Sequence, residues 1–246
     1  MYPMPHYRPL LCEFHAHTTW SDGVLALPEL VDLYGRVGFD VLAVTDHVLS
    51  SAHEPYGWHD SVGAERFADY VREIDVEAQR ALEAYGMLVI PGAELSLNDT
   101  DPDLAAHAVA VGLRSFVSLD DGLEPALCTA RAAGAALIAA HPHATQDDPT
   151  PGRTTRRFFV ERDELAVLVD RFELFNRNTL FPWISELSLP FVACGDFHRP
   201  RHLDGWKTLL PCELDEAAVV AYLRSQRPAF LTRLAIGLTA EVPQAA

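Results

Sequence analysis

Short runs of apolar residues alternate along the chain with longer stretches in which apolar positions recur every three or four residues. The short runs, which predict strands, cover residues 10–14, 41–44, 87–90, 108–111, 135–140, 172–175 and 191–194, with a short last strand expected at 230–232. The clearest helical patterns cover residues 28–37, 64–85 and 215–224. This alternation is typical of βα units built around a parallel sheet. We therefore predict an α/β fold with a barrel-like number of strands.

The composition indicates a globular protein, which we interpret as one domain over residues 1–246. Apolar residues make up 49% of the sequence, but they form no stretch long enough to cross a bilayer, so we expect no membrane contact. The formal net charge of −16 opposes general binding to long nucleic acids, whose phosphates require a basic surface. The N-terminal segment has prolines and lacks the continuous apolar stretch of a signal peptide. A cytoplasmic location is the resulting expectation.

Residues with ligand-type side chains follow the predicted strands. They are His15, His17, Asp46, His47, Glu94, His141, His143, Glu173, Asp196 and His198. In a parallel α/β barrel the C-terminal ends of the strands converge on one mouth, so these side chains are expected to meet there. One histidine beside a strand is usually a hydrogen-bonded structural residue, but repetition at six strand ends favours a common site.

The spacing of these residues indicates a transition-metal site. His15 and His17 are two residues apart, so on a strand both imidazoles point to the same side, and Asp196 and His198 repeat this spacing. Imidazole combined with carboxylate suits zinc, manganese or iron, whereas calcium prefers oxygen ligands alone.

Other catalytic chemistries lack their sequence marks. The chain contains no GxSxG elbow, Walker A loop or GxGxxG turn, and its four cysteines form no CxxC pair. Ser21 and Cys194 lie near the predicted site, but nothing in the sequence favours either as a nucleophile.

Five motifs resemble those of the PHP (polymerase and histidinol phosphatase) family. In chain order they are His15-Ala16-His17-Thr18 with Ser21-Asp22-Gly23, then Thr45-Asp46-His47, Gly92-Ala93-Glu94, His141-Pro142-His143 and Gly195-Asp196-Phe197-His198. The resemblance spans nearly the whole chain. It implies a distorted (β/α)7 barrel, similar to a TIM barrel, that holds a cluster of two or three divalent ions.

The resemblance also implies how the ligands are shared among the ions. His15, His17, Glu94 and Asp196 would hold the first ion, and Glu94 would bridge to a second ion held by His107 and His141. Asp22, His47 and His198 would hold a third. The alternative for His107 is an ordinary histidine at a strand edge, because it precedes its apolar run where the other ligands follow theirs.

Further residues are expected to support the ligands or to touch the substrate. Asp46, Glu173 and Asn176 are interpreted as supports of the ligands. The expected substrate contacts are His143, Arg177 and Arg199, since the planar guanidinium of arginine matches phosphate oxygens two at a time. Arg153, Arg156 and Arg157 are weaker candidates on a loop after His143, and residues 48–63 are either a lid or a plain surface loop.

The function expected from these features is hydrolysis of a small phosphorylated metabolite or nucleotide. A metal-bound hydroxide would attack the phosphoryl group, with Glu94, Asp196 and His198 at the reacting centre and His198 as a source of the leaving group's proton. The alternatives are a nuclease that trims short oligonucleotides and a non-catalytic metal-binding accessory module. The complete ligand set favours an enzyme, and no feature of the sequence points to a particular substrate, native metal or oligomeric state.

Overall fold

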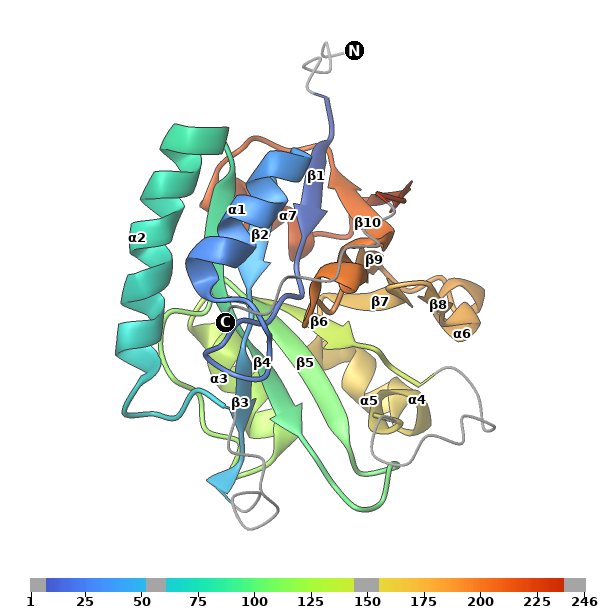
Figure 1. Cartoon of the computed structure of the whole chain (residues 1–246). Helices are drawn as coiled ribbons and strands as arrows, with labels where there is room; N and C mark the ends of the chain where they lie inside the picture. The colour runs from blue at the N-terminus through green and yellow to red at the C-terminus, as the bar shows by residue number, and fades with distance from the viewer. Residues whose placement is uncertain (1–7, 52–60, 144–154, 237–246) are drawn as a thin grey trace.

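A strongly curled mixed sheet forms the centre of the computed structural model, and helices pack around it (Figure 1). The structure describes residues 8–51, 61–143 and 155–236. The strands are β1 (Leu10–Glu13), β2 (Val41–Val44), β3 (His47–Leu49), β4 (Leu88–Leu97), β5 (Ala106–Val111), β6 (Ala136–Ala140), β7 (Arg171–Asn176), β8 (Thr179–Leu180), β9 (Phe191–Cys194), β10 (Gly205–Leu210) and β11 (Phe230–Leu234).

The helices lie mainly on the outside of the sheet. They are α1 (Leu27–Val37), α2 (Phe67–Tyr85), α3 (Leu123–Ala132), α4 (Arg157–Val160), α5 (Arg162–Leu165), α6 (Pro182–Glu186) and α7 (Glu216–Leu223). Over the described ranges, no helix combines the length and the apolar character that a membrane crossing requires.

The sequence of α1 accounts for its limits and its packing. Leu27, Leu30, Val31 and Tyr34 follow the i, i+3, i+4, i+7 spacing and are buried together on one face. The helix stops at Gly38, whose φ of 92° is the left-handed conformation that favours glycine. α2 repeats the spacing in its first two turns and packs beside α1 (Figure 1).

Parallel and antiparallel pairs are mixed within the sheet. The strand order is β11-β10-β1-β2-β4-β5-β6-β7-β8, and in addition β3 pairs with β4 and β9 with β7. The pairs β1–β2, β2–β4, β6–β7 and β7–β9 are parallel, whereas β1–β10, β4–β5 and β5–β6 are antiparallel. The predicted α/β class is confirmed. The prediction of a parallel sheet is wrong for these three pairs and for β7–β8 and β10–β11, which are also antiparallel, and the (β/α)7 strand count is not confirmed.

Two apolar clusters lie on opposite faces of the sheet. One joins the outer face to α1, α2 and α3, and the other includes Ile90, Val109 and Ile138 together with residues of α7. Alternation along the strands puts Glu94 on the same face as Ile90, and His107 on the same face as Val109. The polar side chains of the site therefore continue the face that carries the second cluster.

The predicted limits of β4 need correction. A strand end was expected at residue 90, with Glu94 beyond it, but β4 continues to Leu97 and Glu94 lies inside the strand. Gly92 permits this, because an added Cβ at that position would lie 2.7 Å from the carbonyl oxygen of Ala110 on β5. The glycine therefore marks a close approach of two strands rather than a turn.

Candidate metal centre

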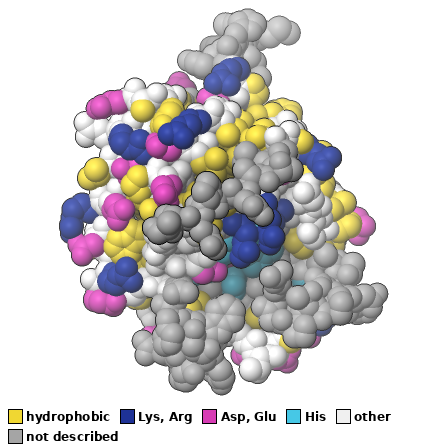
Figure 2. All heavy atoms as spheres, in the orientation of Figure 1, with side chains coloured by type: hydrophobic (Ala, Val, Ile, Leu, Met, Phe, Trp, Pro, Cys, Tyr) yellow, Lys and Arg dark blue, Asp and Glu magenta, His cyan; other side chains and the backbone are white. Residues whose placement is uncertain are grey.

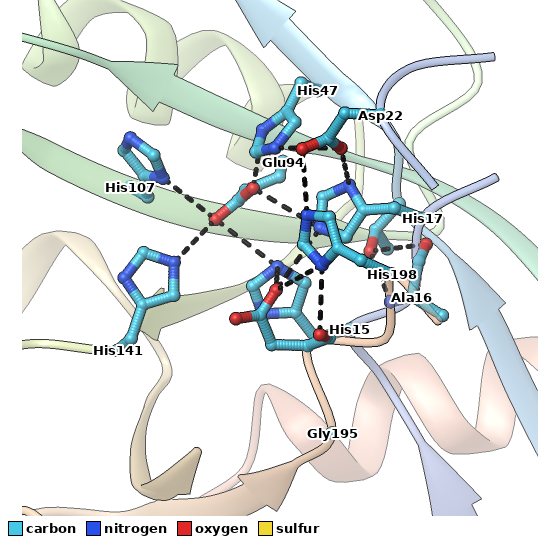
Figure 3. Close-up of polar contacts among 12 residues, drawn as sticks. His15, Ala16, His17, Asp22, His47, Glu94, His107, His141, Gly195 and His198 are labelled. Atoms are coloured by element: carbon cyan, nitrogen blue, oxygen red, sulfur yellow. Dashed lines mark hydrogen bonds and ion pairs between the residues drawn. The ribbon is translucent and has the colours of Figure 1, made fainter. Parts of the chain in front are cut away.

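The predicted ligands come from many elements and meet at one edge of the sheet (Figure 3). They are His15 and His17 after β1, Asp22 on the loop that follows, His47 on β3, Glu94 on β4, His107 on β5, His141 after β6, and Asp196 and His198 after β9. The antiparallel direction of β5 explains why His107 precedes its apolar run. Its first residues pair with the last residues of β4, so His107 lies opposite Ser96 and beside Ala140.

Glu94 lies at the centre of the group and is completely buried. Its Oε1 lies 3.3 Å from His15 Nε2, 3.1 Å from His107 Nδ1 and 3.1 Å from His141 Nε2, and its Oε2 lies 3.6 Å from His17 Nε2 and 2.7 Å from His47 Nδ1. Figure 3 shows His107 and His141 on one side of this carboxylate, with His15, His17 and His198 on the other. One carboxylate therefore faces imidazoles from several different elements.

Two aspartates extend the cluster away from Glu94. Asp22 Oδ2 lies 3.1 Å from His198 Nε2, and Asp22 Oδ1 lies 3.5 Å from His47 Nε2. Asp196 Oδ1 lies 3.7 Å from His15 Nε2 and 3.7 Å from His17 Nε2. Two neighbouring ligand atoms each about 2.0–2.2 Å from one ion lie roughly 2.8–3.6 Å apart in octahedral or tetrahedral geometry. The spacings around Asp22 and Glu94 largely match this range.

Four overlapping groups of these residues have the spacing of a metal site. The groups are His17, Asp22, His47 and His198; His15, His17 and Asp196; His15, Glu94 and His141; and His47, Glu94 and His107. Each of the nine predicted ligands belongs to at least one group, whereas Asp46, His143 and Glu173 belong to none.

Each of six histidines has one ring nitrogen held by a protein group and directs the other toward the carboxylates. The held atoms and their partners are His15 Nδ1 with Glu173 (2.8 Å), His17 Nδ1 with Ser21 Oγ (3.4 Å), His47 Nδ1 with Ser96 Oγ (2.8 Å), His107 Nε2 with Asn98 Oδ1 (2.9 Å), His141 Nδ1 with Thr155 Oγ1 (3.2 Å) and His198 Nδ1 with the Asp196 carbonyl (3.1 Å). Such partners fix the tautomer and the ring orientation of metal-binding histidines. The ring nitrogen left for an ion is therefore Nδ1 in His107 and Nε2 in His15, His17, His141 and His198, whereas both nitrogens of His47 face a carboxylate, Nδ1 toward Glu94 and Nε2 toward Asp22.

Buried atoms at the centre fit a cation. Within the described ranges, His15 Nε2, His17 Nε2 and Glu94 Oε2 are buried and make no hydrogen bond. Leaving such atoms unsatisfied costs about 1–3 kcal/mol each. A divalent ion between them would satisfy all three, so the residues present fit a divalent transition metal.

The two central carboxyls are held in their charged form. Burial works to raise the pKa of Glu94, but the charges of His15 and His47 outweigh it, and the pKa lies well below its ordinary value. The pKa of Asp196 is likewise lowered despite burial, through His15 and the hydrogen bond from His198. Both groups are therefore anionic at neutral pH, as metal ligands must be.

The histidines differ in their charge. Burial tends to lower the pKa of His198, but its hydrogen bonds with Asp196 and Asp22 raise it to about 10. The pKa of His15 is also raised, because nearby carboxylates outweigh its burial. Burial and the neighbouring His47 and His198 instead lower the pKa of His17 well below its ordinary value. Without a metal ion, His15 and His198 therefore carry positive charge, whereas His17 is neutral.

Backbone strain gathers around the centre. Within the described residues, positive φ at non-glycine positions occurs at His141 (29°), Asp196 (44°), Arg177 (55°) and Ser188 (55°). Two of these four are predicted ligands and a third, Arg177, contacts Asp196. Strained residues of this kind concentrate at functional sites, where the surrounding structure holds them in place.

Glu173 connects two predicted ligands. Its Oε1 accepts from His15 Nδ1 at 2.8 Å, and its Oε2 accepts from the backbone N–H of His141 at 2.6 Å and from Asn176 Nδ2 at 2.9 Å. Glu173 and Asn176 therefore lie where support of the ligands was expected.

Asp46 shapes the loop that carries Asp22. Its carboxylate accepts from the backbone N–H groups of Thr18 (2.8 Å) and Ser21 (3.0 Å) and from both hydroxyls. Burial raises the pKa of Asp46, with these hydrogen bonds acting against it. Its contacts are those of a residue that orders the loop.

The expected substrate contacts lie in different surroundings. Arg177 Nη2 donates to the Asp196 carboxylate at 2.8 Å and to the Asp196 carbonyl at 2.8 Å, so much of its guanidinium faces a predicted ligand. Arg199 is exposed, whereas His143 is buried and its carbonyl accepts from Trp183 Nε1. Figure 2 shows a group of Lys and Arg side chains beside the histidines.

The weaker arginine candidates pair with acids away from the ligands. Arg156 Nη1 lies 3.0 Å from Asp103, and Arg157 pairs with Glu124 and Glu161. Arg153 and residues 52–60 of the expected lid lie outside the described residues.

Three supporting residues, Ser96, Asn98 and Thr155, were not predicted from the sequence. Ser96 lies two residues after Glu94 on the same face of β4, a spacing from which its role was readable. Asn98 and Thr155 reach His107 and His141 from connecting segments, so only the folded chain brings them there.

Solved structures with a similar fold place this architecture among known proteins. A two-domain protein from Bacteroides vulgatus that contains a predicted PHP-like metal-dependent phosphoesterase matches with a TM-score of 0.65 and 20% identity, over 93% of this chain and 66% of the other. The fold is PHP-like. The resemblance drawn from the five motifs is therefore confirmed at the level of the fold. A sulfate-bound, metal-free amidohydrolase from Chromobacterium violaceum matches this PHP-like chain with a TM-score of 0.51 and 16% identity, over 77% of this chain and 88% of the other.

Sequence comparison gives a more limited match. No protein-family model matches it. The DNA polymerase/3'-5' exonuclease PolX of Bacillus subtilis is 30% identical over 94 residues, which is 35% of this chain and 15% of PolX. The chain thus corresponds to a small part of PolX and to about two thirds of the Bacteroides protein.

Proposed function

We propose that this PHP-like chain is a metal-dependent phosphoesterase that hydrolyses a small phosphorylated metabolite or nucleotide. The observation that carries the proposal is the arrangement of six imidazoles around Glu94, Asp22 and Asp196, each with one ring nitrogen held by the protein. The remaining nitrogens and the carboxylates together form overlapping ligand groups.

The donor set supports two or three zinc, manganese or iron ions. His15, His17, Glu94 and Asp196 would hold one, and Glu94, His107 and His141 a second. Asp22, His47 and His198 would hold a third. His47 belongs to this third set through Nε2, because its Nδ1 is taken by Ser96. Bound ions would activate a water molecule and polarise the phosphoryl group.

The protein groups at this centre have distinct tasks. Glu94 and Asp196 are anionic and hold position, and neither is free to act as a general base while it binds an ion. His198 is one of four partly exposed imidazoles among the predicted ligands, and its Nδ1 is tied to the Asp196 carbonyl. When only two ions are bound, His198 keeps the proton on Nε2, and we assign to it the proton that the leaving oxygen requires; a third ion at Nε2 would replace that proton and would stabilise the leaving oxygen in its place.

Arginines beside the centre favour an anionic substrate. Arg177 uses Nε and Nη2 within the protein, toward Gly195 and Asp196, which leaves Nη1 for a substrate oxygen. Arg199 follows His198 directly and is exposed. In a chain with a formal net charge of −16, arginines at this position are the expected means of attracting a phosphate.

A nuclease acting on short oligonucleotides is the second candidate. The likeness to part of PolX, whose name includes a 3'-5' exonuclease, favours it. The acidic charge of the chain argues against long nucleic acids, although a short substrate needs basic groups only near the ions.

The test is a hydrolysis assay on the full chain loaded with manganese or zinc. The panel contains phosphomonoesters, phosphodiesters, nucleoside monophosphates, short oligonucleotides and simple amides. We expect release of inorganic phosphate from a small phosphoester, loss of turnover with chelator and recovery when metal is restored.

Asp196→Asn is the matched inactive control, since asparagine tolerates positive φ but is a poorer ligand. Oligonucleotide cleavage without phosphomonoester turnover would establish the nuclease. Amide hydrolysis alone, or no hydrolysis by metal-loaded protein, would refute a phosphoesterase.

A further inference from the structure

A buried ion pair lies directly beneath the metal centre without belonging to its ligand set. Lys207 of β10 donates from Nζ to Glu13 Oε2 of β1 at 2.6 Å, and both side chains are completely buried. Cys12 and Thr208 are register partners in this antiparallel pair of strands, and Glu13 follows Cys12 while Lys207 precedes Thr208.

Stability alone does not account for such a pair. Removing two charges from water costs several kcal/mol per ion, and apolar residues of similar volume usually serve the fold equally well or better. A buried pair of this kind therefore calls for a reason that depends on geometry.

The carboxylate of Glu13 joins the two segments that carry predicted ligands. Its Oε1 accepts from the backbone N–H groups of Phe14 (3.1 Å), His15 (3.2 Å) and Gly195 (2.8 Å). His15 is itself a predicted ligand, and Gly195 directly precedes Asp196. Lys207 binds the opposite oxygen, which leaves Oε1 for the three amides.

Hydrogen bonds beyond Glu13 continue this junction. The backbone N–H of Phe197 donates to the His15 carbonyl at 3.1 Å, and the N–H of His17 donates to the Phe197 carbonyl at 2.8 Å. The segment after β1 and the segment after β9 thus run side by side, with Glu13 at their base. A shift in the Glu13 carboxylate would therefore move a predicted ligand on each segment, His15 on the first and Asp196 on the second.

Gly195 lies directly against the ion pair. A Cβ added at this position would lie 2.3 Å from Lys207 Nζ and 2.4 Å from Glu13 Oε2. Contacts this short are not possible for a real side chain, so glycine lets the backbone before Asp196 rest on the pair.

We infer that Glu13 and Lys207 are positioning residues that set His15 and Asp196 in their ligand geometry before an ion binds. The inference rests on the proposed metal-dependent function. The pair fixes the junction of the two segments, and the junction fixes the spacing of the two ligands. Metal affinity is therefore the property that the pair controls.

The test measures cobalt binding to the metal-free full chain, through the visible absorption of bound Co²⁺. The variants are Glu13→Gln, Lys207→Met and the double variant, with folding checked by circular dichroism. Because loss of groups that orient ligands typically costs about 10- to 100-fold in metal affinity, we expect a loss of that size and an altered spectrum in all three.

Asp40→Asn is the matched control. Asp40 is also buried, and its Oδ2 accepts from the backbone N–H of Leu11 at 2.8 Å. Leu11 is on β1, as Glu13 is, but it lies toward the start of the strand, whereas the ligands follow the end of the strand. This variant should bind Co²⁺ with wild-type affinity and spectrum. Equal losses in Asp40→Asn and Glu13→Gln would assign the effect to general loosening of β1 and overturn the inference.

Wild-type Co²⁺ affinity and spectrum in folded Glu13 and Lys207 variants would also overturn it. If those variants do not fold, amide hydrogen exchange on the metal-free wild type decides. The amides of His15 and Gly195 should then exchange as slowly as those in the central strands, and fast exchange would refute a preformed junction. Wild-type protein that binds Co²⁺ but hydrolyses nothing would refute the proposed function and leave this inference standing.

Discussion

The guanidinium of Arg177 lies against Asp196 and donates from Nη2 both to its carboxylate and to its carbonyl, each at 2.8 Å. Both residues have positive φ, 55° for Arg177 and 44° for Asp196. The arginine that the sequence suggested as a substrate anchor is therefore also tied to a predicted metal ligand.

Arg177→Ala should lower kcat/KM by about one to two decades, since a charge-assisted contact is worth roughly 1.5–3 kcal/mol. Lysine should restore part of the activity, because a point charge cannot reproduce the planar fork. Steady-state kinetics together with metal analysis measure both effects. Metal content should stay near the wild-type level, because Asp196 keeps its contacts with His15, His17 and His198, and an emptied site would show that Arg177 serves Asp196 rather than the substrate.

Protein prepared without chelator should carry two or three transition-metal ions per chain. Too many ligand atoms converge around Glu94 for one ion to satisfy them all. Elemental analysis by plasma mass spectrometry gives the number directly. Fewer than one ion per chain would be incompatible with a cluster.

Asp196→Asn and His15→Ala should each reduce turnover by at least about 100-fold, the upper end of the effect typical for residues that merely orient a ligand. Neither side chain is part of the two apolar clusters, so secondary structure should persist. Circular dichroism beside the hydrolysis assay separates the two effects. Retained turnover in both variants would remove them from the reaction.

Metal affinity should rise with pH between about 7 and 9. His198, whose pKa is raised to about 10 by Asp196 and Asp22 against its burial, carries a proton that an ion at Nε2 must displace. Each displaced proton makes the apparent affinity about tenfold greater per pH unit. His17 adds nothing here, because its lowered pKa leaves it neutral.

Calorimetry in buffers with different ionisation enthalpies counts the released protons. The stability of the metal-free fold should change with pH in the opposite direction to the metal affinity. Because the pKa of His198 is raised to about 10, its protonated form stabilises the fold fully below about pH 6.5, and this contribution is lost as the pH rises through about 10. An affinity independent of pH would contradict both statements.

Strands with plain apolar runs were predictable, and β2 has the predicted limits of residues 41 and 44. β10 was not predicted, because its sequence Gly-Trp-Lys-Thr-Leu-Leu places a lysine where a strand with one buried face would show an apolar residue. The charge of Lys207 is balanced by Glu13, almost two hundred positions earlier in the chain. No local pattern carries that information.

The ligand residues were predictable as a set because their types and spacings are local properties of the sequence. The groups that orient them were less so. Glu173 was predicted because it belongs to an apolar run that forms β7, whereas Asn98 and Thr155 meet their histidines only through the path of the connecting segments. Direction also matters, since the antiparallel course of β5 brings His107 to the site from the opposite end of its strand.

The central place of Glu94 has a thermodynamic consequence. Ions that share one carboxylate cannot bind independently, because the first to arrive changes the charge and the position of the oxygen atoms that the second must use. Binding at one position then changes the affinity at the other, and the same factor applies in both directions. A titration of this centre should consequently follow a coupled isotherm, with a macroscopic constant for each successive ion rather than one for each set of ligands.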